Sequence, residues 1–250
     1  MDGEAVPVRA SVALAAYNGE RYLREQVDSI LRCLSEKDEL VISCDKSTDR
    51  TEEIAEQYAR HDPRVRVLRN QRPGVQSNFN NAVEACRGKY IFLSDQDDVW
   101  TGDKVEKVVS VFEKTGADMV MHDGYMTDAA LNPFPKTIFE RYGTDDRYLP
   151  NLIRCTYWGC CMAFRSEFRR IICPFPTEGG TGHDLWISLL ATRHGKIARC
   201  NEVLTLHRLH GDNQSAPKRR PLPVILRHRI NAVFNLKKRE RALKKAGLLT

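Results

Sequence analysis

Apolar runs and helix-like repeats alternate along the first hundred residues of the chain. Four runs have the length and apolar content of buried strands, at 11–16, 40–43, 65–68 and 90–93. The segments between them carry apolar side chains at helical spacing, at Tyr22, Val27, Ile30, Leu31 and Leu34 and again over 54–58 and 77–86. Strands that alternate with helices at this pitch predict an α/β fold with a mostly parallel sheet covered by helices on both faces.

Beyond residue 100 the alternation continues and then weakens. Helices are predicted over 104–114 and 185–194, and strands over 117–122, 159–164 and 203–207. Residues 123–157 mix aromatics, prolines and charges, as a substrate-shaping loop region does, although ordinary surface excursions look the same. In the turn at 45–49, Ser47 or Thr48 is expected to cap the helix that follows.

Composition adds few constraints to this picture. The chain has 250 residues, of which 42% are hydrophobic, enough for a substantial core. No uninterrupted apolar stretch has the roughly 18 residues of a spanning helix, and the first residues lack a secretory signal. The eight cysteines are scattered without a C-x-x-C pair, which favours reduced thiols. We therefore expect a cytoplasmic protein.

Charge divides the chain in two. Residues 216–250 contain eleven Lys or Arg and one acid, which gives the tail a net charge of +10. Because the net charge of the whole chain is +6, the first 215 residues carry −4. We expect a folded domain over 1–215 and a basic amphipathic tail over 216–250. An apolar stripe is predicted on this tail at Ile225, Ile230, Val233, Phe234 and Leu236. The pattern favours a peripheral position on an anionic membrane over a solvated helix or nucleic-acid binding, and we expect no nucleic acid partner.

Three carboxylates follow the fourth predicted strand directly, in the block Asp95-Gln96-Asp97-Asp98. Such a cluster alone is more often a solvated turn. However, ligands of parallel sheets bind at the carboxyl ends of strands, where Mg²⁺ or Mn²⁺ held by oxygen ligands can bridge phosphates. The placement therefore indicates a metal site for a phosphate-containing ligand.

Four segments together resemble one enzyme family. They are the strand and turn at 12–19, the Asp-rich turn at 42–51, the stretch from Asn70 to Asp98, and the motifs that run from Gly182-His183-Asp184 to the block at 208–213. In order and spacing they resemble family 2 glycosyltransferases of the GT-A fold, a Rossmann-like fold that binds nucleotide sugars. Within that family the chain is most similar to bacterial enzymes that build rhamnose-containing cell-surface polysaccharides.

The resemblance implies a reaction and its partners. An L-rhamnose unit would pass from dTDP-rhamnose to a polysaccharide or lipid-linked glycan at the inner face of the cell membrane. Transfer of galactose or another hexose from a UDP-sugar is the nearest alternative. A sugar nucleotidyltransferase is disfavoured because its glycine-rich signature is missing between Val8 and Gly19. A non-catalytic carbohydrate-binding module is disfavoured because Asp95, Asp97 and Asp184 are all present.

The resemblance also assigns roles in the chemistry. Asp95 would touch the ribose, and Asp97 would hold Mg²⁺ or Mn²⁺ with His207 completing the metal shell. Asp98 is either a further ligand or, as we favour, a cap for the next helix. Asp184 would be the general base, and one base without a carboxylate nucleophile implies inversion at the anomeric carbon.

Recognition of the donor is assigned in the same way. The nucleotide would contact Ala15, Tyr17, Asp45, Arg72 and Asn78, together with Asp95. Trp100 would stack on the sugar, with Trp158 and Trp186 as alternatives, and Arg208 would neutralise phosphate, with His210 as an alternative. The chain departs from the family pattern at Cys44, where the first of two adjacent acids is expected.

Overall fold

The computed structural model describes residues 7–211, 213 and 221–249. The first five residues of the predicted tail, 216–220, lie outside this part of the chain, since description resumes at Pro221. The described strands are β1 (Ala10–Ala16), β2 (Asp38–Cys44), β3 (Val65–Arg69), β4 (Tyr90–Asp95), β5 (Val99–Trp100), β6 (Met119–Thr127), β7 (Pro133–Thr137), β8 (Met162–Arg165) and β9 (Ile197–Arg208). They form one mixed sheet in the order β3-β2-β1-β4-β8-β6-β9-β5, with β7 beside β6.

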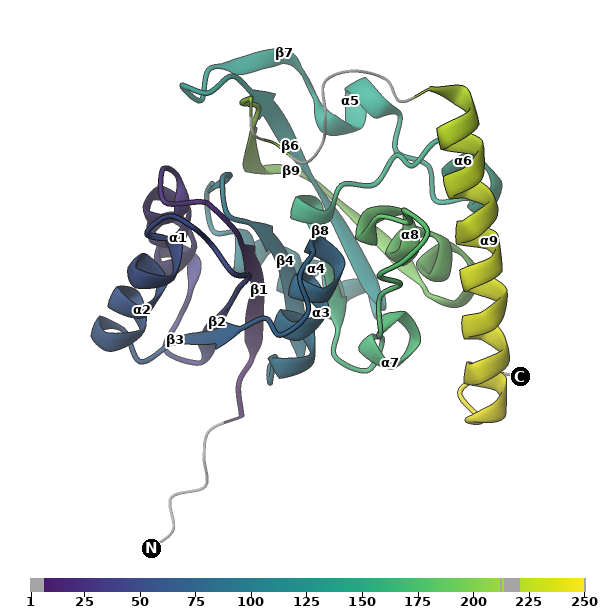
Figure 1. Ribbon diagram of the computed structural model, residues 1–250, viewed down its shortest axis with the longest axis horizontal. Coiled ribbons are helices and arrows are strands. Elements are labelled where there is room, and N and C mark those ends of the chain that lie inside the picture. The colour runs from purple at the N-terminus through teal and green to yellow at the C-terminus, as the bar shows by residue number, and fades with distance from the viewer. Residues whose placement is uncertain (1–6, 212, 214–220, 250) are drawn as a thin grey trace, which may run out of the picture.

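Helices cover both faces and one end of this sheet (Figure 1). The described helices are α1 (Leu23–Cys33), α2 (Thr51–His61), α3 (Val75–Ala85), α4 (Lys104–Thr115), α5 (Ile138–Tyr142), α6 (Tyr148–Ile153), α7 (Arg169–Ile172), α8 (His183–His194) and α9 (Leu222–Lys245). Figure 1 shows α1 and α2 at the β3 end of the molecule and α9 at the opposite edge, with α6 beside the upper half of α9. The predicted α/β fold with a C-terminal helix is confirmed.

Side-chain alternation along the central strands builds two hydrophobic layers. On β4, Phe92 faces the layer that α1, α2 and α4 complete, whereas Ile91 and Leu93 face the layer of α3 and α8. Neighbouring residues of a strand point to opposite faces, so a strand covered on both sides reads as a continuous apolar run. The parallel pairs β3-β2, β2-β1 and β1-β4 put the carboxyl ends of four strands at the same edge.

The later half contains more structure than its pattern predicted. Residues 123–157 hold the end of β6, then β7, α5 and α6. The segment predicted as a strand over 159–164 begins with a 3₁₀ turn at Gly159–Cys161 before β8. The last strand is longer than predicted, because β9 follows β6 in parallel from Met119 opposite Ile197 to Thr127 opposite Arg208.

Two predicted helix caps are wrong. The helix α2 begins at Thr51, with Arg50 as its cap residue and no capping side chain, so neither Ser47 nor Thr48 caps it. Ser47 Oγ instead accepts a hydrogen bond from Asn18 N. The helix α4 is preceded by Asp103, five residues after Asp98, which is therefore no helix cap.

Among the described residues, no helix has both the length and the apolar character required to span a bilayer. All eight cysteines are free thiols.

Replacement of Phe92 by alanine tests the packing of the central strand. The Phe92 side chain is fully buried, with its ring centroid 5.8 Å from that of Trp100. We expect Phe92→Ala to lower the free energy of unfolding by about 3–5 kcal/mol, because a large cavity opens in the core. Denaturant unfolding followed by circular dichroism measures this change. Phe234→Ala, at a side chain that is 68% exposed, is the matched control, and an equal effect of both variants would contradict the packing.

Candidate active site

The carboxyl ends of β2, β1 and β4 lie side by side and bring the predicted site residues together. Ala15 is paired with Asp95 across β1 and β4, and Ala16 is paired with Cys44 across β1 and β2. The turns that follow these three strands carry Tyr17, Asp45 and the acidic block. Segments that are up to 80 residues apart in sequence therefore share one edge of the sheet, as open parallel sheets require of a ligand site.

Gln96 holds two of these turns together. Its side-chain oxygen accepts from Tyr17 N at 2.7 Å, and its side-chain nitrogen donates to Tyr17 O at 2.8 Å. A Cβ on Gly19 would lie only 2.2 Å from Gln96 Oε1, so glycine leaves room for this amide. The sequence pattern predicts no role for Gln96, and its position between Asp95 and Asp97 is the one local sign of a role. The Tyr17 ring itself is 46% exposed.

Asp45 and Cys44 have different environments. Asp45 accepts from Lys46 N at 2.9 Å and from Gly74 N at 2.7 Å, so its carboxylate joins the turn after β2 to the loop before α3. The Cys44 thiol lies in the hydrophobic layer of α1, α2 and α4, and burial raises its pKa to about 12. A carboxylate at position 44 would therefore enter an apolar core, which explains why a neutral thiol is tolerated there.

Asn78 and Arg72 lie near the same edge. Asn78 is buried in α3 and donates to Ala16 O at 3.0 Å, while its Oδ1 atom accepts no hydrogen bond from any described residue. Arg72 is exposed in the loop before α3, and its carbonyl accepts from Asn70 Nδ2 at 2.5 Å. The Asn78 carbonyl oxygen is thus an open acceptor beside β1.

Asp98 is the most deeply buried of the three clustered acids, with 1% exposure. Its Oδ1 accepts from His207 Nδ1 at 2.8 Å and from Arg208 N at 3.2 Å, which ties the turn after β4 to the end of β9. Burial alone would raise the pKa of Asp98, but the charge and hydrogen bond of His207 lower it below the usual value. The pKa of His207, which burial alone would lower, is raised well above its usual value by Asp98.

Asp97 has a separate set of partners nearer the rim. Its Oδ2 accepts from His210 Nε2 at 2.8 Å and from Asn213 Nδ2 at 3.1 Å. Burial, with the neighbouring charge of Asp98, raises the pKa of Asp97. Two imidazoles thus flank the acidic block, His207 at Asp98 and His210 at Asp97.

Four side chains could share one metal ion. Ligand atoms of Asp95, Asp98, Cys160 and His207 all lie within 4.8 Å of one another. Asp98 Oδ2 and His207 Nε2 are buried without a hydrogen bond to any described residue, so both have an unused ligand position. Two carboxylates and an imidazole suit Mg²⁺ or Mn²⁺, whereas the Cys160 thiol is a soft ligand whose pKa is raised well above its usual value by the Cys161 thiol and by burial.

Asp95, one of these four residues, is also close to the start of α8. Burial, together with the charges of Asp98 and Asp97, raises the pKa of Asp95 to about 7. The charges of Asp95 and His183 also act on each other's pKa, which puts the first turn of α8 close to the acidic block. Buried acids in contact with one another are typical of functional sites.

Asp184 lies in that first turn of α8. Its side chain is 34% exposed, and His183 Nε2 lies 2.8 Å from Asp184 Oδ1. A Cβ on Gly159 would lie 2.5 Å from both of these atoms, so the glycine makes room for them. The residue that caps α8 is Gly182, and Asp184 is therefore available for a role other than capping.

Trp100 does not face the site, and its predicted stacking on a sugar is wrong. The short strand β5 pairs with β9 and turns the Trp100 ring into the core, where it is 3% exposed. Phe92 packs beside the ring, and Lys104 Nζ lies 3.8 Å from its centroid. Trp158, one of the alternatives, is partly exposed, and its ring centroid lies 5.2 Å from that of His207.

Arg208 is held by the protein on several sides. Its guanidinium donates to Asp97 O, to Ala129 O and to Glu25 Oε2 at 3.0, 2.7 and 2.5 Å. The side chain is buried and braces the acidic turn. Its contact with phosphate stays a prediction.

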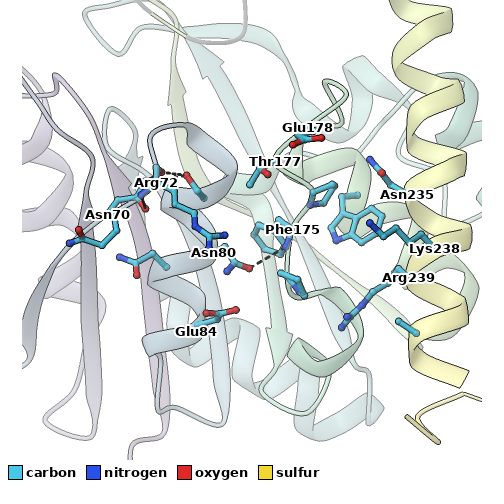
Figure 2. A pocket seen from close by; sticks show the side chains of 17 residues that line it. Asn70, Arg72, Asn80, Glu84, Phe175, Thr177, Glu178, Asn235, Lys238 and Arg239 are labelled. Carbon is cyan, nitrogen blue, oxygen red and sulfur yellow. Dashed lines mark hydrogen bonds between the residues drawn. The ribbon is translucent and has the colours of Figure 1, made fainter. Parts of the chain in front are cut away.

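A groove of about 740 Å³ extends from the loop before α3 along this helix towards α9 (Figure 2). Arg72 lies at one end of the groove and Lys238 of α9 at the other, with Asn80 and Phe175 between them. Glu178, which precedes the glycine-rich loop before α8, also lines it. The lining is rich in amide side chains, namely Asn70, Gln71, Asn80, Asn81 and Asn235.

Asp95 provides a test of the electrostatics. The pKa of Asp95 is about 7 in the folded protein and has a usual value of 3.8, so the fold favours the protonated form. Ionisation of Asp95 therefore lowers the stability of the fold as the pH rises between these two values. We expect Asp95→Asn, in EDTA, to raise the melting temperature at pH 8 and to leave it nearly unchanged at pH 4. Thermal unfolding at both pH values measures the difference, with the exposed Glu36→Gln as control. A gain that does not depend on pH would contradict the assignment.

Comparisons with known proteins agree with this geometry. The family model described as "Glycosyl transferase family 2" matches residues 11–172. The putative teichuronic acid biosynthesis glycosyltransferase TuaG of Bacillus subtilis is 31% identical over 223 residues, which cover 83% of this chain and 82% of TuaG. Hyaluronan synthase of Pasteurella multocida is 29% identical over 210 residues, which cover 83% of this chain but 21% of the synthase. The chain likewise matches only 32% of the B. subtilis glycosyltransferase EpsJ.

Solved structures share the fold at low sequence identity. Staphylococcus aureus TarS 1–349 in complex with UDP-GlcNAc superposes with a TM-score of 0.71 at 18% identity, over 94% of this chain and 70% of TarS. Glucosyl-3-phosphoglycerate synthase of Mycobacterium tuberculosis, in complex with Mn²⁺, UDP and phosphoglyceric acid, gives a TM-score of 0.58 at 20% identity, over 92% and 78% of the two chains. The chain is a glycosyltransferase of the GT-A fold, and it belongs to glycosyl transferase family 2.

Proposed function

We propose that the enzyme is an inverting, metal-dependent glycosyltransferase that moves L-rhamnose from dTDP-rhamnose to a lipid-linked or polysaccharide acceptor in cell-surface glycan synthesis. The observation that carries the proposal is the convergence of Asp95, Asp97 and Asp184 at one edge of the sheet. The metal ion, the leaving group and the general base would thus lie close to one another. The choice of rhamnose rests on the resemblance of the chain, within its family, to bacterial enzymes that build rhamnose-containing cell-surface polysaccharides.

The nucleotide would lie across the ends of β1, β2 and β4. Support comes from the positions of the six predicted residues, which lie on these strand ends or the turns after them (Ala15, Tyr17, Asp45 and Asp95), in the loop before α3 (Arg72) or in α3 (Asn78). The exposed ring of Tyr17 can stack on a base, and Asn78 Oδ1 is an open acceptor near it. The Asp45 carboxylate accepts a hydrogen bond from Gly74 N and so fixes the loop before α3. Contact between Asp45 and the base would depend on the position in which this loop is held.

A divalent cation would be held by the acidic block. The proposed ligands are Asp97 and His207, with Asp95 and Asp98 from the group of four and His210 beside Asp97. Mg²⁺ or Mn²⁺ bound there would neutralise the charge that builds on the leaving nucleoside diphosphate. The buried, unused atoms Asp98 Oδ2 and His207 Nε2 support this assignment.

Asp184 would act as the base. Its carboxylate would accept the proton of the acceptor hydroxyl as that oxygen bonds to the anomeric carbon, while the bond from this carbon to the diphosphate oxygen breaks. The leaving group departs as a nucleoside diphosphate, so a single displacement inverts the configuration. The Asp184 side chain, in the first turn of α8 next to His183, is partly exposed, which suits a group that must contact an incoming acceptor.

The acceptor glycan would occupy the groove of Figure 2. Amide side chains suit sugar hydroxyls, and Arg72 and Lys238 suit an acidic sugar or a phosphate. Trp158, whose ring centroid lies 5.2 Å from that of His207, would take the place of Trp100 beside the sugar, and Arg208 would act on phosphate mainly by bracing Asp97. A lipid-linked acceptor would be presented at the inner face of the membrane, which the basic segment 216–250 would contact.

A UDP-hexose donor is the second candidate, supported by a specific observation. TarS and glucosyl-3-phosphoglycerate synthase, which share the fold, were solved with UDP-GlcNAc and with UDP and Mn²⁺, respectively. Among the relatives, TuaG aligns over most of both chains, and its name points to teichuronic acid, another cell-surface polymer. Both candidates use the same edge of the sheet and differ in base and sugar.

Nucleotide-sugar binding tests the donor and the metal together. In a thermal-shift panel with Mn²⁺ or Mg²⁺, we expect dTDP-rhamnose to raise the melting temperature more than UDP-glucose, UDP-galactose or UDP-GlcNAc, because a ligand that binds only the folded state stabilises it by mass action. Asp97→Asn should abolish the metal-dependent part of the shift, with Asp118→Asn as the control acid. A larger shift with a UDP-sugar would select the second candidate, and an unchanged metal response would remove Asp97 from the ligand set.

Loss of the base should separate turnover from binding. We expect Asp184→Asn to slow release of the nucleoside diphosphate by about 10²–10⁴-fold while the donor-induced thermal shift is kept, since the base acts on the acceptor oxygen. Water can serve as acceptor in this assay. Glu113→Gln, which removes an exposed carboxylate of α4 outside the site and the groove, is the control. Full turnover by Asp184→Asn would place the base elsewhere.

A further inference from the structure

Exposed apolar side chains gather on α6 and α9. Among the described residues, six of the eight large apolar side chains that are exposed belong to these two helices. They are Leu149 and Ile153 on α6, exposed by 65% and 76%, and Leu222, Leu226, Ile230 and Phe234 on α9, exposed by 80%, 62%, 48% and 68%. We call these six residues the α6–α9 ridge. Such concentration on one surface marks an interaction site, whereas scattered apolar residues would not.

Helix geometry makes the α9 part of the ridge continuous. Its four residues recur at intervals of four and so follow one side of the helix for about 18 Å. The other side of α9 is buried through Ala232, Leu236 and Leu243, and Ala232 packs against Leu185 and Leu189 of α8. Leu236 therefore belongs to the core and not to the exposed stripe predicted from the sequence.

A shallow apolar hollow lies between the two helices. Its volume is about 230 Å³, and its lining consists of Leu152, Arg229, Ile230, Val233 and Phe234. Figure 1 shows α6 beside the upper half of α9, and the residues that line the hollow belong to these two helices. The ridge thus offers a broad, shallow apolar surface built from two helices.

The outward side of α9 changes from apolar to basic towards its C-terminal half. Lys237, Arg241, Lys244 and Lys245 follow Phe234 on this side, and all four are exposed. The single acid of the helix, Glu240, is already paired with Arg193 and His194. An apolar surface that continues into uncompensated cations matches a bilayer with anionic headgroups.

Acids near the ridge do not offset this charge. In the loop before α6, Asp145 is paired with Arg147, and Asp146 is paired with Arg199. A second copy of the chain on the same surface would bring the basic half of α9 against its own counterpart, because a two-fold contact uses the same patch twice. Like charges would then oppose each other.

We propose that the α6–α9 ridge is a membrane-docking surface, in which the ridge enters the headgroup boundary of an anionic bilayer and the basic half of α9 lies on the headgroups. The proposal goes beyond a flexible basic tail, because α6 belongs to the folded body and α9 is fixed to α8. The docked surface therefore has one orientation relative to the sheet.

That orientation brings the catalytic end of the molecule to the bilayer. Asn231 of α9 donates to Gly179 O at 3.0 Å, and the ring of His228 fills the space above Gly180, where a Cβ would lie 2.4 Å from His228 Nε2. These glycines belong to the loop that leads into α8 and Asp184. The helix that lies on the membrane is therefore also packed against the loop before the proposed base.

Flotation of the full chain with lipid vesicles tests the proposal. We expect the chain to float with phosphatidylcholine vesicles that contain phosphatidylglycerol, and to float poorly with phosphatidylcholine alone. Leu226→Ser with Phe234→Ser should reduce the bound fraction about tenfold or more, because two exposed apolar side chains no longer enter the lipid. Leu248→Ser, at an exposed leucine outside the ridge, should float as the unchanged chain does.

A second variant keeps the test independent of one pair of residues. Lys237→Gln with Arg241→Gln and Lys244→Gln should remove the preference for anionic vesicles, and unchanged melting temperatures would show that both variants fold. Absence of flotation by the unchanged chain would overturn the proposal. So would a concentration-dependent dimer in light scattering that the Ser variant abolishes without any lipid binding. Flotation needs neither donor nor acceptor, so this proposal and the proposed reaction can fail separately.

Discussion

The contact between Asp98 and His207 is the constraint on which the candidate site depends. It joins the turn after β4 to the end of β9, two segments 109 residues apart, and both side chains are almost fully buried. A buried carboxylate is tolerated only when a charge or hydrogen bonds compensate the loss of water. The imidazole and Arg208 N supply that compensation for one oxygen, and Asp98 Oδ2 is left for a ligand.

The buried lysine Lys104 connects the elements that surround this contact. Lys104 Nζ donates to Cys160 O at 3.1 Å and to Thr205 Oγ1 at 2.8 Å, and burial lowers its pKa to about 8. It thereby joins α4 to the 3₁₀ turn and to β9, directly behind the group of Asp95, Asp98, Cys160 and His207. The polar groups of the site thus form part of a connected network that fixes three elements relative to one another.

The sequence predicted the strand ends well and the side-chain directions beyond them poorly. Buried parallel strands are continuous apolar runs, so β1, β2, β3 and β4 could be found within a few residues, and the acidic block follows from where β4 ends. Trp100 could not be placed, because its inward direction depends on a two-residue strand paired with β9. The sequence favours a helix cap at Asp98, because the real partner of this side chain, His207, has no local signal in the sequence. The family pattern predicts that Cys44 lies in the nucleotide pocket, yet strand alternation turns it into the core.

The long separation between Asp98 and His207 also bears on how the enzyme is made. Domains begin to fold from the N-terminus as the chain is synthesised, and β1 to β4 with α1 to α3 are complete by residue 95. Asp98 lies next to this early portion, but its imidazole partner and the β9 strand that carries it emerge about a hundred residues later. A nascent chain therefore passes through a long interval in which the acidic turn stays hydrated, and the end of the sheet that carries this turn is completed only when β9 is placed between β6 and β5.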